Sequence, residues 1–264
     1  MFIHDINPIA IPLNFIKEGY GIRYYGIIYA LAFLFAYWFL HNQKKFLKLN
    51  QEQTDSLFMY ILIGNIIGAR LLDFIFYNPS ELIYNPLRVL MIWQGGLSFH
   101  GGLIGIVLAI YLFSKKHKIS IYKVTDTIVI PASLALFFGR IANFINAELI
   151  GRITSVPWAV NFNGEQNSVG QLIGRHPSQL YEAIKNLVIF TTLILIKSNE
   201  DKKNSYKPGF RTWLFIGMYG ILRLITNFWR EDTLTFFGIL STGQTLSLIM
   251  VLVASYFLIK YKNI

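Results

Sequence analysis

The stretch that decides the fold is residues 124–151, which read VTDTIVIPASLALFFGRIANFINAELIG. An apolar run long enough to cross a bilayer, for which a helix needs about 20 residues, ends in a polar cluster with Arg140, Asn143, Asn146 and Glu148. A charged side chain at membrane depth is costly unless it faces a partner, a cavity or a polar ligand. Arg140 is therefore a candidate functional residue, and the alternative is a hydrogen-bonded link between two helices.

The composition of the whole chain also indicates a membrane protein. Of 264 residues, 54% are hydrophobic and only 14% are charged, which is far from the average of a soluble domain. Seven charge-poor stretches have lengths near that of a membrane-spanning helix, at 24–40, 57–77, 89–113, 124–146, 180–196, 212–229 and 236–259. We therefore predict an all-α polytopic membrane protein with about seven transmembrane helices.

The third of these stretches is unusually long and contains Gly95, Gly96, Gly101 and Gly102. A helix that is interrupted at membrane depth is tolerated only where its backbone faces protein or a cavity. We predict that this stretch is broken or partly re-entrant.

The orientation follows from the basic residues, because cytoplasmic loops of membrane proteins are rich in lysine and arginine. Alternate connections and the C-terminal tail carry most of them, at Lys44, Lys45, Lys48, Lys115, Lys116, Lys118, Lys123, Lys197, Lys202, Lys203, Lys207, Arg211, Lys260 and Lys262. We predict an N-terminus outside and a C-terminus in the cytoplasm. The net charge of +10 is then a signal of topology and does not indicate nucleic-acid binding.

The largest connection on the outer side is 147–179, whose prolines and glycines favour turns and short strands. We expect it to form a small periplasmic cap within a single domain that comprises residues 1–264.

No internal repeat typical of inverted-repeat transporters is visible in the sequence. The chain has no cysteine, so any thiol that reacts must belong to the substrate.

Two helical faces carry arginine. Arg140 and Asn143 are three residues apart and share a face, while Arg223, Asn227 and Arg230 have the spacing i, i+4 and i+7. Two such faces can clamp an anionic group, because the guanidinium fork matches phosphate oxygens in pairs.

Three other polar positions have simpler interpretations. Arg70 and Asp73 are three residues apart in the second stretch, and we predict that they neutralise each other. His176 stands just before a predicted helix and can be a turn residue. His100 lies in the interrupted third stretch, where it is either a packing residue or a general base, the role that histidine most often takes at neutral pH.

Several motifs, in order along the chain, together resemble bacterial prolipoprotein diacylglyceryl transferases. They are 99–102 (FHGG), 139–151, 175–182 (RHPSQLYE), Arg223, 230–231 and 243–244. The resemblance covers nearly the whole chain, and 139–151 fits the family signature at every fixed position. It implies a multi-pass enzyme of the bacterial cytoplasmic (inner) membrane that needs no cofactor and no metal.

The resemblance also implies the reaction and its partners. Such an enzyme moves the diacylglyceryl group of phosphatidylglycerol onto the lipobox cysteine thiol of a prolipoprotein, forms a thioether and releases glycerol phosphate. Its partners are membrane lipids and signal peptides, and no nucleic acid. The implied catalytic residues are His100, Arg140 and Arg223, and the expected substrate-binding residues are Tyr25, Arg140, Asn143, Asn146, Glu148, Gly151, Asn227 and Arg230.

One position departs from the family pattern. Four residues after the second arginine the family usually has glutamate, whereas this chain has Asn227. An asparagine can form a hydrogen bond with Arg223 but cannot neutralise it.

The alternative function is that of a protein that translocates a lipid or an anion and uses the same intramembrane arginines as a passage.

Overall fold

The computed structural model describes residues 1–13, 21–91, 95–203, 205–231, 234–236 and 239–262. The chain divides into two compact units, a first unit of 1–36 and 128–264 and a second unit of 37–127. The boundaries fall inside two helices, α1 (Tyr24–Asn42) and α6 (Ile121–Ile145).

Most of the described chain is helical, as predicted for a polytopic membrane protein. Six described helices are long and apolar enough to cross a membrane, namely Tyr24–Asn42, Gln51–Phe76, Phe99–His117, Ile121–Ile145, Ser178–Lys203 and Thr242–Lys260. The predicted sixth stretch forms α8 (Phe210–Thr226), which has only 17 residues. At about 1.5 Å per residue, α8 is roughly 25 Å long, at the short end of the range for a spanning helix.

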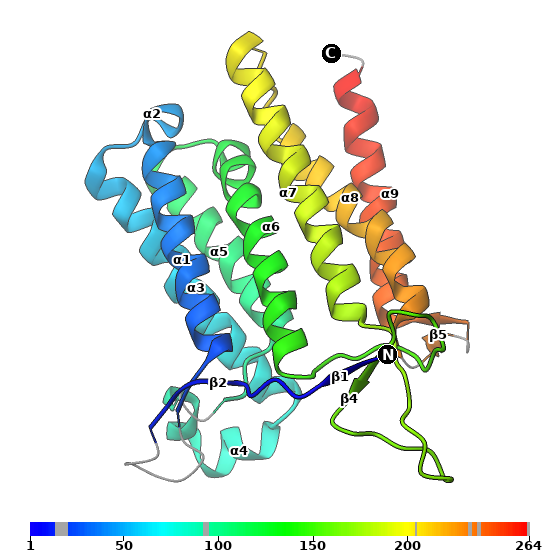
Figure 1. Ribbon diagram of the computed structural model, residues 1–264. Helices are drawn as coiled ribbons and strands as arrows, with labels where there is room; N and C mark the ends of the chain where they lie inside the picture. The colour runs from blue at the N-terminus through cyan, green and yellow to red at the C-terminus, as the bar shows by residue number, and fades with distance from the viewer. Residues whose placement is uncertain (14–20, 92–94, 204, 232–233, 237–238, 263–264) are drawn as a thin grey trace. The chain divides into compact units, whose positions relative to one another are not determined.

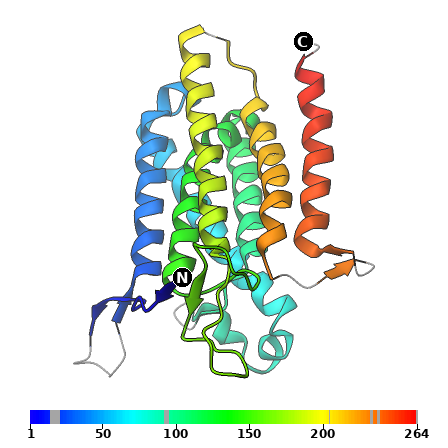
Figure 2. The same ribbon diagram turned by 45° about the vertical axis from the view of Figure 1, so that its right-hand side comes forward.

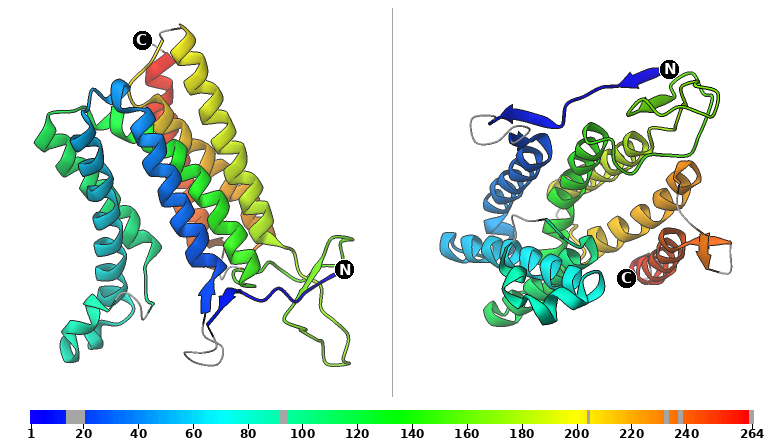
Figure 3. Two further views of the ribbon diagram at one scale, coloured as in Figure 1. Left: turned by 60° about the vertical axis from the view of Figure 1, so that its left-hand side comes forward. Right: turned by 90° about the horizontal axis from the view of Figure 1, so that it is seen from below.

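In the second unit, α3 (Gln51–Phe76) and α5 (Phe99–His117) lie side by side (Figure 3). Glycines let the two backbones approach, because a Cβ on Gly64 would lie 2.7 Å from the carbonyl oxygen of Gly105. Small residues are the usual means of close helix packing in membranes. The unit also contains the short helices α2 (Lys44–Leu47), α4 (Pro79–Tyr84) and η1 (Pro86–Leu90).

The predicted interruption of the third stretch is present in the described residues. Gly95 and Gly96 have φ angles of +79° and +74°, which favour glycine. The helix α5 begins only at Phe99, where the side chain of Ser98 accepts a hydrogen bond from the backbone N–H of Gly101. Residues 92–94 of this stretch lie outside the described residues.

In the first unit, α7 (Ser178–Lys203), α8 and α9 (Thr242–Lys262) run side by side (Figures 1 and 2). Aromatic rings contribute to this packing, since Trp213 of α8 stacks on Phe257 of α9 with 4.0 Å between ring centroids. The helix α8 continues into a short 3-10 helix, η3 (Asn227–Trp229). A hairpin of β5 (Leu234–Phe236) and β6 (Leu240–Ser241) then leads to α9.

The strands at the start of the chain form two small sheets in the first unit. The strand β1 (Phe2–His4) pairs in parallel with β4 (Val160–Phe162), while β2 (Ile9–Pro12) pairs with β3 (Gly21–Arg23) (Figure 1). Residues 146–177, all of them described, contain turns, one short strand and isolated bridges but no helix. The helix α9 runs away from these segments to its end at Lys262 (Figure 1).

Candidate active site

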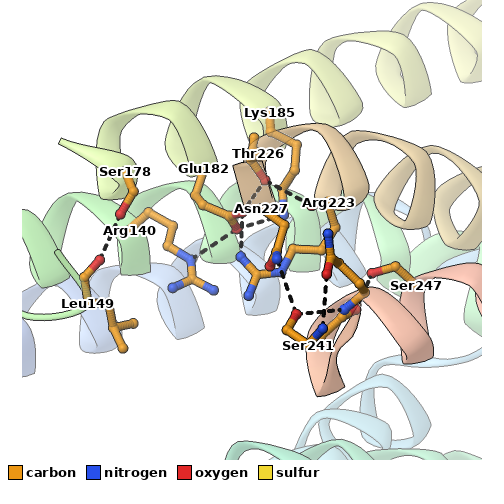
Figure 4. A network of polar contacts seen from close by, with 12 residues as sticks. Arg140, Leu149, Ser178, Glu182, Lys185, Arg223, Thr226, Asn227, Ser241 and Ser247 are labelled. Atoms are coloured by element: carbon orange, nitrogen blue, oxygen red, sulfur yellow. Dashed lines mark hydrogen bonds and ion pairs between the residues drawn. The ribbon is translucent and has the colours of Figure 1, made fainter. Parts of the chain in front are cut away.

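A fully buried carboxylate, that of Glu182 on α7, is the centre of a polar network (Figure 4). Its Oε2 atom lies 2.8 Å from Nζ of Lys185 and 3.7 Å from Nε of Arg140. Its Oε1 atom lies 2.5 Å from Nη1 of Arg223 and accepts a hydrogen bond from the hydroxyl of Thr226. Three helices therefore meet at one side chain.

The charges in this cluster do not cancel. Among the described residues, Arg140, Lys185 and Arg223 place three positive charges within 4 Å of the one negative charge of Glu182, so these four side chains have a net charge of +2. The two arginine side chains are 18% and 13% exposed. Because the positive charges of these four side chains outnumber the negative one at a place largely removed from water, the cluster is suited to receive an anion.

The predicted polar face of α6 is held together by Glu148. Arg140 donates from Nη1 to Oδ1 of Asn143 at 3.5 Å. The side-chain amides of Asn143 and Asn146 then donate to the two oxygens of Glu148, at 3.2 Å and 3.1 Å. Glu148 can reach these side chains because α6 ends at Ile145 and a turn follows. In this turn the backbone N–H of Glu148 donates to the carbonyl of Asn143 at 2.9 Å.

The start of α7 fixes that turn. Gln179 donates from its amide to the carbonyl of Glu148 at 2.6 Å, and the hydroxyl of Ser178 donates to the carbonyl of Leu149 at 2.8 Å. Leu149 has a φ of +56°, an uncommon conformation for a side chain of this kind that the surrounding bonds maintain. The turn between Asn146 and Gly151 is thus tied to the helix that carries Glu182.

Gly151 lies between two other chain segments. Its N–H donates to the carbonyl of His176 at 3.0 Å, and a Cβ at this position would lie 2.6 Å from that oxygen and 2.5 Å from the carbonyl oxygen of Trp229. A larger residue has no space there. The structure therefore gives Gly151 a role in backbone packing.

Tyr25, near the start of α1, belongs to the same unit. Its ring stacks on Tyr29 at 4.7 Å between centroids, and the hydroxyl of Tyr25 donates to that of Tyr29 at 3.2 Å. Tyr25 is close enough to Arg140 and Glu148 to interact with their charges. Three predicted site residues are therefore neighbours, although they come from different elements.

The predicted face of Arg223, Asn227 and Arg230 is correct for the first two residues, because the backbone N–H of Asn227 still donates to the carbonyl of Arg223, and wrong for Arg230, which lies beyond the helix. Asn227 belongs to η3 and Arg230 has extended backbone angles, φ −89° and ψ 150°. The buried amide of Asn227 donates to the hydroxyl of Ser241 at 3.1 Å (Figure 4). The carbonyl of Arg230 accepts a hydrogen bond from Nε of Arg152 at 2.7 Å.

Arg223 has a carboxylate partner even though residue 227 is an asparagine. A carboxylate still contacts Arg223, but it comes from α7 instead of from the end of α8. In the sequence, Glu182 stood out only as the last residue of the motif 175–182, and Lys185 was not among the predicted site residues. A polar spacing of i and i+3 in an otherwise apolar helix was the signal that could have identified both.

A second ionic cluster stabilises residues 147–179. Arg175 binds both oxygens of Glu165, at 2.6 Å and 2.7 Å, and its Nη1 lies 2.6 Å from Oε2 of Glu231. The hydrogen bonds from Arg175 hold the pKa of the Glu165 carboxyl below its usual value. The cluster thereby connects residues 147–179 to the chain that follows η3.

His176 is next to this cluster. Burial lowers the pKa of the His176 imidazole. Its Nδ1 lies 3.1 Å from the hydroxyl of Tyr181, which accepts a hydrogen bond from the indole of Trp158 at 2.7 Å. These contacts fit a residue that orders the turn before α7.

His100 lies in the second unit, in the first turn of α5. Its side chain is exposed, and its ring contacts that of Phe99 at 5.7 Å between centroids. Its role as a base stays a prediction.

The predicted pairing of Arg70 with Asp73, also in the second unit, is wrong. Arg70 is buried and donates instead to five backbone carbonyls of the segment before α5, those of Arg88, Val89, Met91, Gly95 and Gly96. Asp73 accepts a hydrogen bond from the amide of Asn78 at 3.2 Å. An irregular segment leaves carbonyls without helical partners, and the five N–H groups of one guanidinium satisfy them.

Comparison with known proteins adds an independent finding. The family model described as prolipoprotein diacylglyceryl transferase matches residues 12–260. The phosphatidylglycerol–prolipoprotein diacylglyceryl transferase of Rhodospirillum rubrum is 38% identical over 94% of this chain and 89% of its own length. The enzymes of the same name from Rickettsia bellii and Wolbachia pipientis are 36% and 37% identical, covering 98% and 91% of this chain and 97% and 91% of their own lengths.

Proposed function

The chain belongs to the prolipoprotein diacylglyceryl transferase family, and from this premise we propose how its residues carry out the reaction. It transfers the diacylglyceryl group of phosphatidylglycerol to prolipoproteins, which is the first step of lipoprotein maturation. The acceptor in our proposal is the thiol of the lipobox cysteine.

The charges of the reaction set the requirement for the site. The sulfur of the cysteine attacks the glyceryl carbon, a C–S bond forms, and the C–O bond to the phosphate breaks. The thiol gives up its proton, and the leaving group is glycerol phosphate. A phosphodiester has one negative charge, whereas a phosphate monoester has about −1.5 to −2 at neutral pH. Negative charge therefore develops on the phosphate as the bond breaks.

Arg140 and Arg223 bind this phosphate in our proposal. The supporting observation is the buried cluster around Glu182, in which three cations and one carboxylate leave a net charge of +2. This charge matches that of the leaving phosphate more closely than that of the diester. An arrangement that favours the more highly charged state lowers the barrier.

The remaining site residues orient the lipid. Tyr25, Asn143, Asn146 and Glu148 surround the polar face of α6, where their hydroxyl, amide and carboxylate groups can bind the glycerol hydroxyls. Gly151, Asn227 and Arg230 support the outer end of the site through backbone and buried contacts.

His100 removes the thiol proton in our proposal. A cysteine has a pKa of about 8.5, and the thiolate is the nucleophile. The exposed imidazole in the first turn of α5 is of the residue type that most often acts as a base at neutral pH.

The protein is a multi-pass protein of the bacterial cytoplasmic membrane in our proposal. We count α8 as a seventh spanning helix, place the N-terminus outside and the C-terminus in the cytoplasm, and assign 147–179 as a periplasmic cap of a single domain. The signal peptide of the prolipoprotein and the lipid would both reach the site from the membrane.

The proposal is tested with the purified protein in vesicles that contain phosphatidylglycerol with a labelled diacylglyceryl group. Transfer of the label to a lipobox peptide is expected for the unchanged protein and not for Arg140→Ala. Arg211→Ala is the matched control, because Arg211 is a buried arginine of the same unit that pairs with Glu200 at 3.2 Å. Near-normal turnover by normally inserted Arg140→Ala would overturn the proposed clamp.

A further inference from the structure

The lysine in the cluster has a position that differs from those of the two arginines. Lys185 is 3% exposed, and its Nζ lies 2.8 Å from Glu182 and 3.8 Å from the ring centroid of Tyr219 on α8. Buried lysines are rare unless they are paired. Lys185 is one turn along α7 from Glu182, so its contact with the carboxylate stays within a single helix.

The two carboxylate oxygens have different partners. Oε2 is shared by Lys185 at 2.8 Å and Arg140 at a looser 3.7 Å, while Oε1 accepts from Arg223 and from the hydroxyl of Thr226. If both arginines turned towards a phosphate, Oε2 would keep Lys185 and Oε1 would keep Thr226. Neither oxygen would be left buried without a donor.

We propose that Lys185 is a positioning residue, the resident counter-ion of Glu182 that allows Arg140 and Arg223 to bind the phosphate. This inference rests on the proposed function. A buried carboxylate without a counter-ion is strongly destabilised. Without Lys185, Glu182 would therefore retain the arginines and compete with phosphatidylglycerol for them.

The net charge of the cluster gives an ordered set of variants. It is +2 in the unchanged protein, +1 in Lys185→Met, +3 in Glu182→Gln and again +2 in the double variant, from the same three cations and one carboxylate. The apparent affinity for phosphatidylglycerol should rise with this charge, so it should be lowest in Lys185→Met and highest in Glu182→Gln. The double variant should bind the lipid better than Lys185→Met alone.

The experiment measures KM and kcat for phosphatidylglycerol in vesicles with a lipobox peptide as acceptor. We expect a several-fold higher KM in Lys185→Met with a smaller change in kcat, and a KM near that of the unchanged protein in Lys185→Met combined with Glu182→Gln. A merely structural lysine would instead lower the amount of folded Lys185→Met and leave the KM of the folded protein unchanged. Lys197→Met is the matched control, since Lys197 pairs with Asp201 at 2.6 Å on the same helix.

The outcomes separate the two proposals. If Arg140→Ala is inactive, either of two results overturns the role of Lys185. One is an unchanged KM in folded Lys185→Met, and the other is a double variant whose KM does not return towards that of the unchanged protein. Normal turnover in Arg140→Ala overturns the phosphate clamp itself, and the role of Lys185 with it.

Discussion

Replacing Glu182 by glutamine should weaken the fold and tighten the binding of anionic lipid at the same time. The carboxylate accepts contacts from Lys185 at 2.8 Å, from Arg223 at 2.5 Å and from Thr226. An amide of the same shape has only one oxygen, so its NH₂ group would face a donor. Three cations would then surround a position that has lost its negative charge.

The expected loss of folding stability in Glu182→Gln follows from the burial of Glu182 and its ion-pair partners. Removing one partner of a buried ion pair costs about 3–5 kcal/mol, and Glu182 is fully buried. A bound anion restores part of the loss, because a ligand present at 100 times its Kd stabilises the folded state by about 2.7 kcal/mol. Glu182→Gln should therefore gain more stability from phosphatidylglycerol than the unchanged protein does.

The assay is equilibrium unfolding in mixed micelles by titration with SDS, followed by tryptophan fluorescence, with and without phosphatidylglycerol. The control is Glu200→Gln, which removes a buried carboxylate whose ion-pair partner is Arg211 at 3.2 Å. This control should lose stability without any specific response to the lipid. An unchanged unfolding midpoint in Glu182→Gln, or an equal lipid response in both variants, would refute the reasoning.

Three further predictions concern other parts of the chain. His100→Gln should be slow at neutral pH and recover as the pH rises towards the thiol pKa of about 8.5, whereas a deficit at every pH would make His100 a headgroup ligand. Asn227→Glu adds a second carboxylate near Arg223, which Glu182 already contacts at 2.5 Å, so KM for phosphatidylglycerol should rise; an unchanged KM would argue against the charge balance. The pKa of Glu165 is lowered in the folded protein by Arg175, so its contribution to stability is complete above the ordinary pKa of 4.5 and is lost as the pH falls through the lower folded value. Limited proteolysis of 147–179 should accelerate in that acidic range, and Glu165→Gln should show the faster cleavage already at neutral pH.

The sequence predicted the helices well because hydropathy is a property of each segment by itself. Helix ends were predicted less well, since they depend on local bonds. The predicted sixth stretch ended at 229, whereas α8 ends at Thr226 and a 3-10 turn follows. The spacing of Arg223, Asn227 and Arg230 places all three on one face only if the helix continues to residue 230, and it does not.

The partners of the charged residues were harder to predict, because they come from other elements. Arg140 and Asn143 were placed correctly on one face, since that spacing is local. The contact between Glu182 and Arg223 joins residues 41 positions apart, which no helical period reveals. The interpretation of Arg70 failed for a related reason, as five carbonyls of a distant segment satisfy it better than a neighbouring carboxylate.

The central claim, that Arg140 and Arg223 bind the phosphate of the lipid, is tested most directly by solid-state NMR. Guanidinium nitrogens labelled with ¹⁵N and the ³¹P nucleus of bound phosphatidylglycerol are recoupled in a bilayer sample of the active protein. We predict a strong ³¹P–¹⁵N dipolar coupling with contributions from both arginines. Each of the substitutions Arg140→Lys and Arg223→Lys should weaken it, because each removes one of the two guanidinium groups. A coupling that is absent, or that neither substitution changes, would contradict the claim.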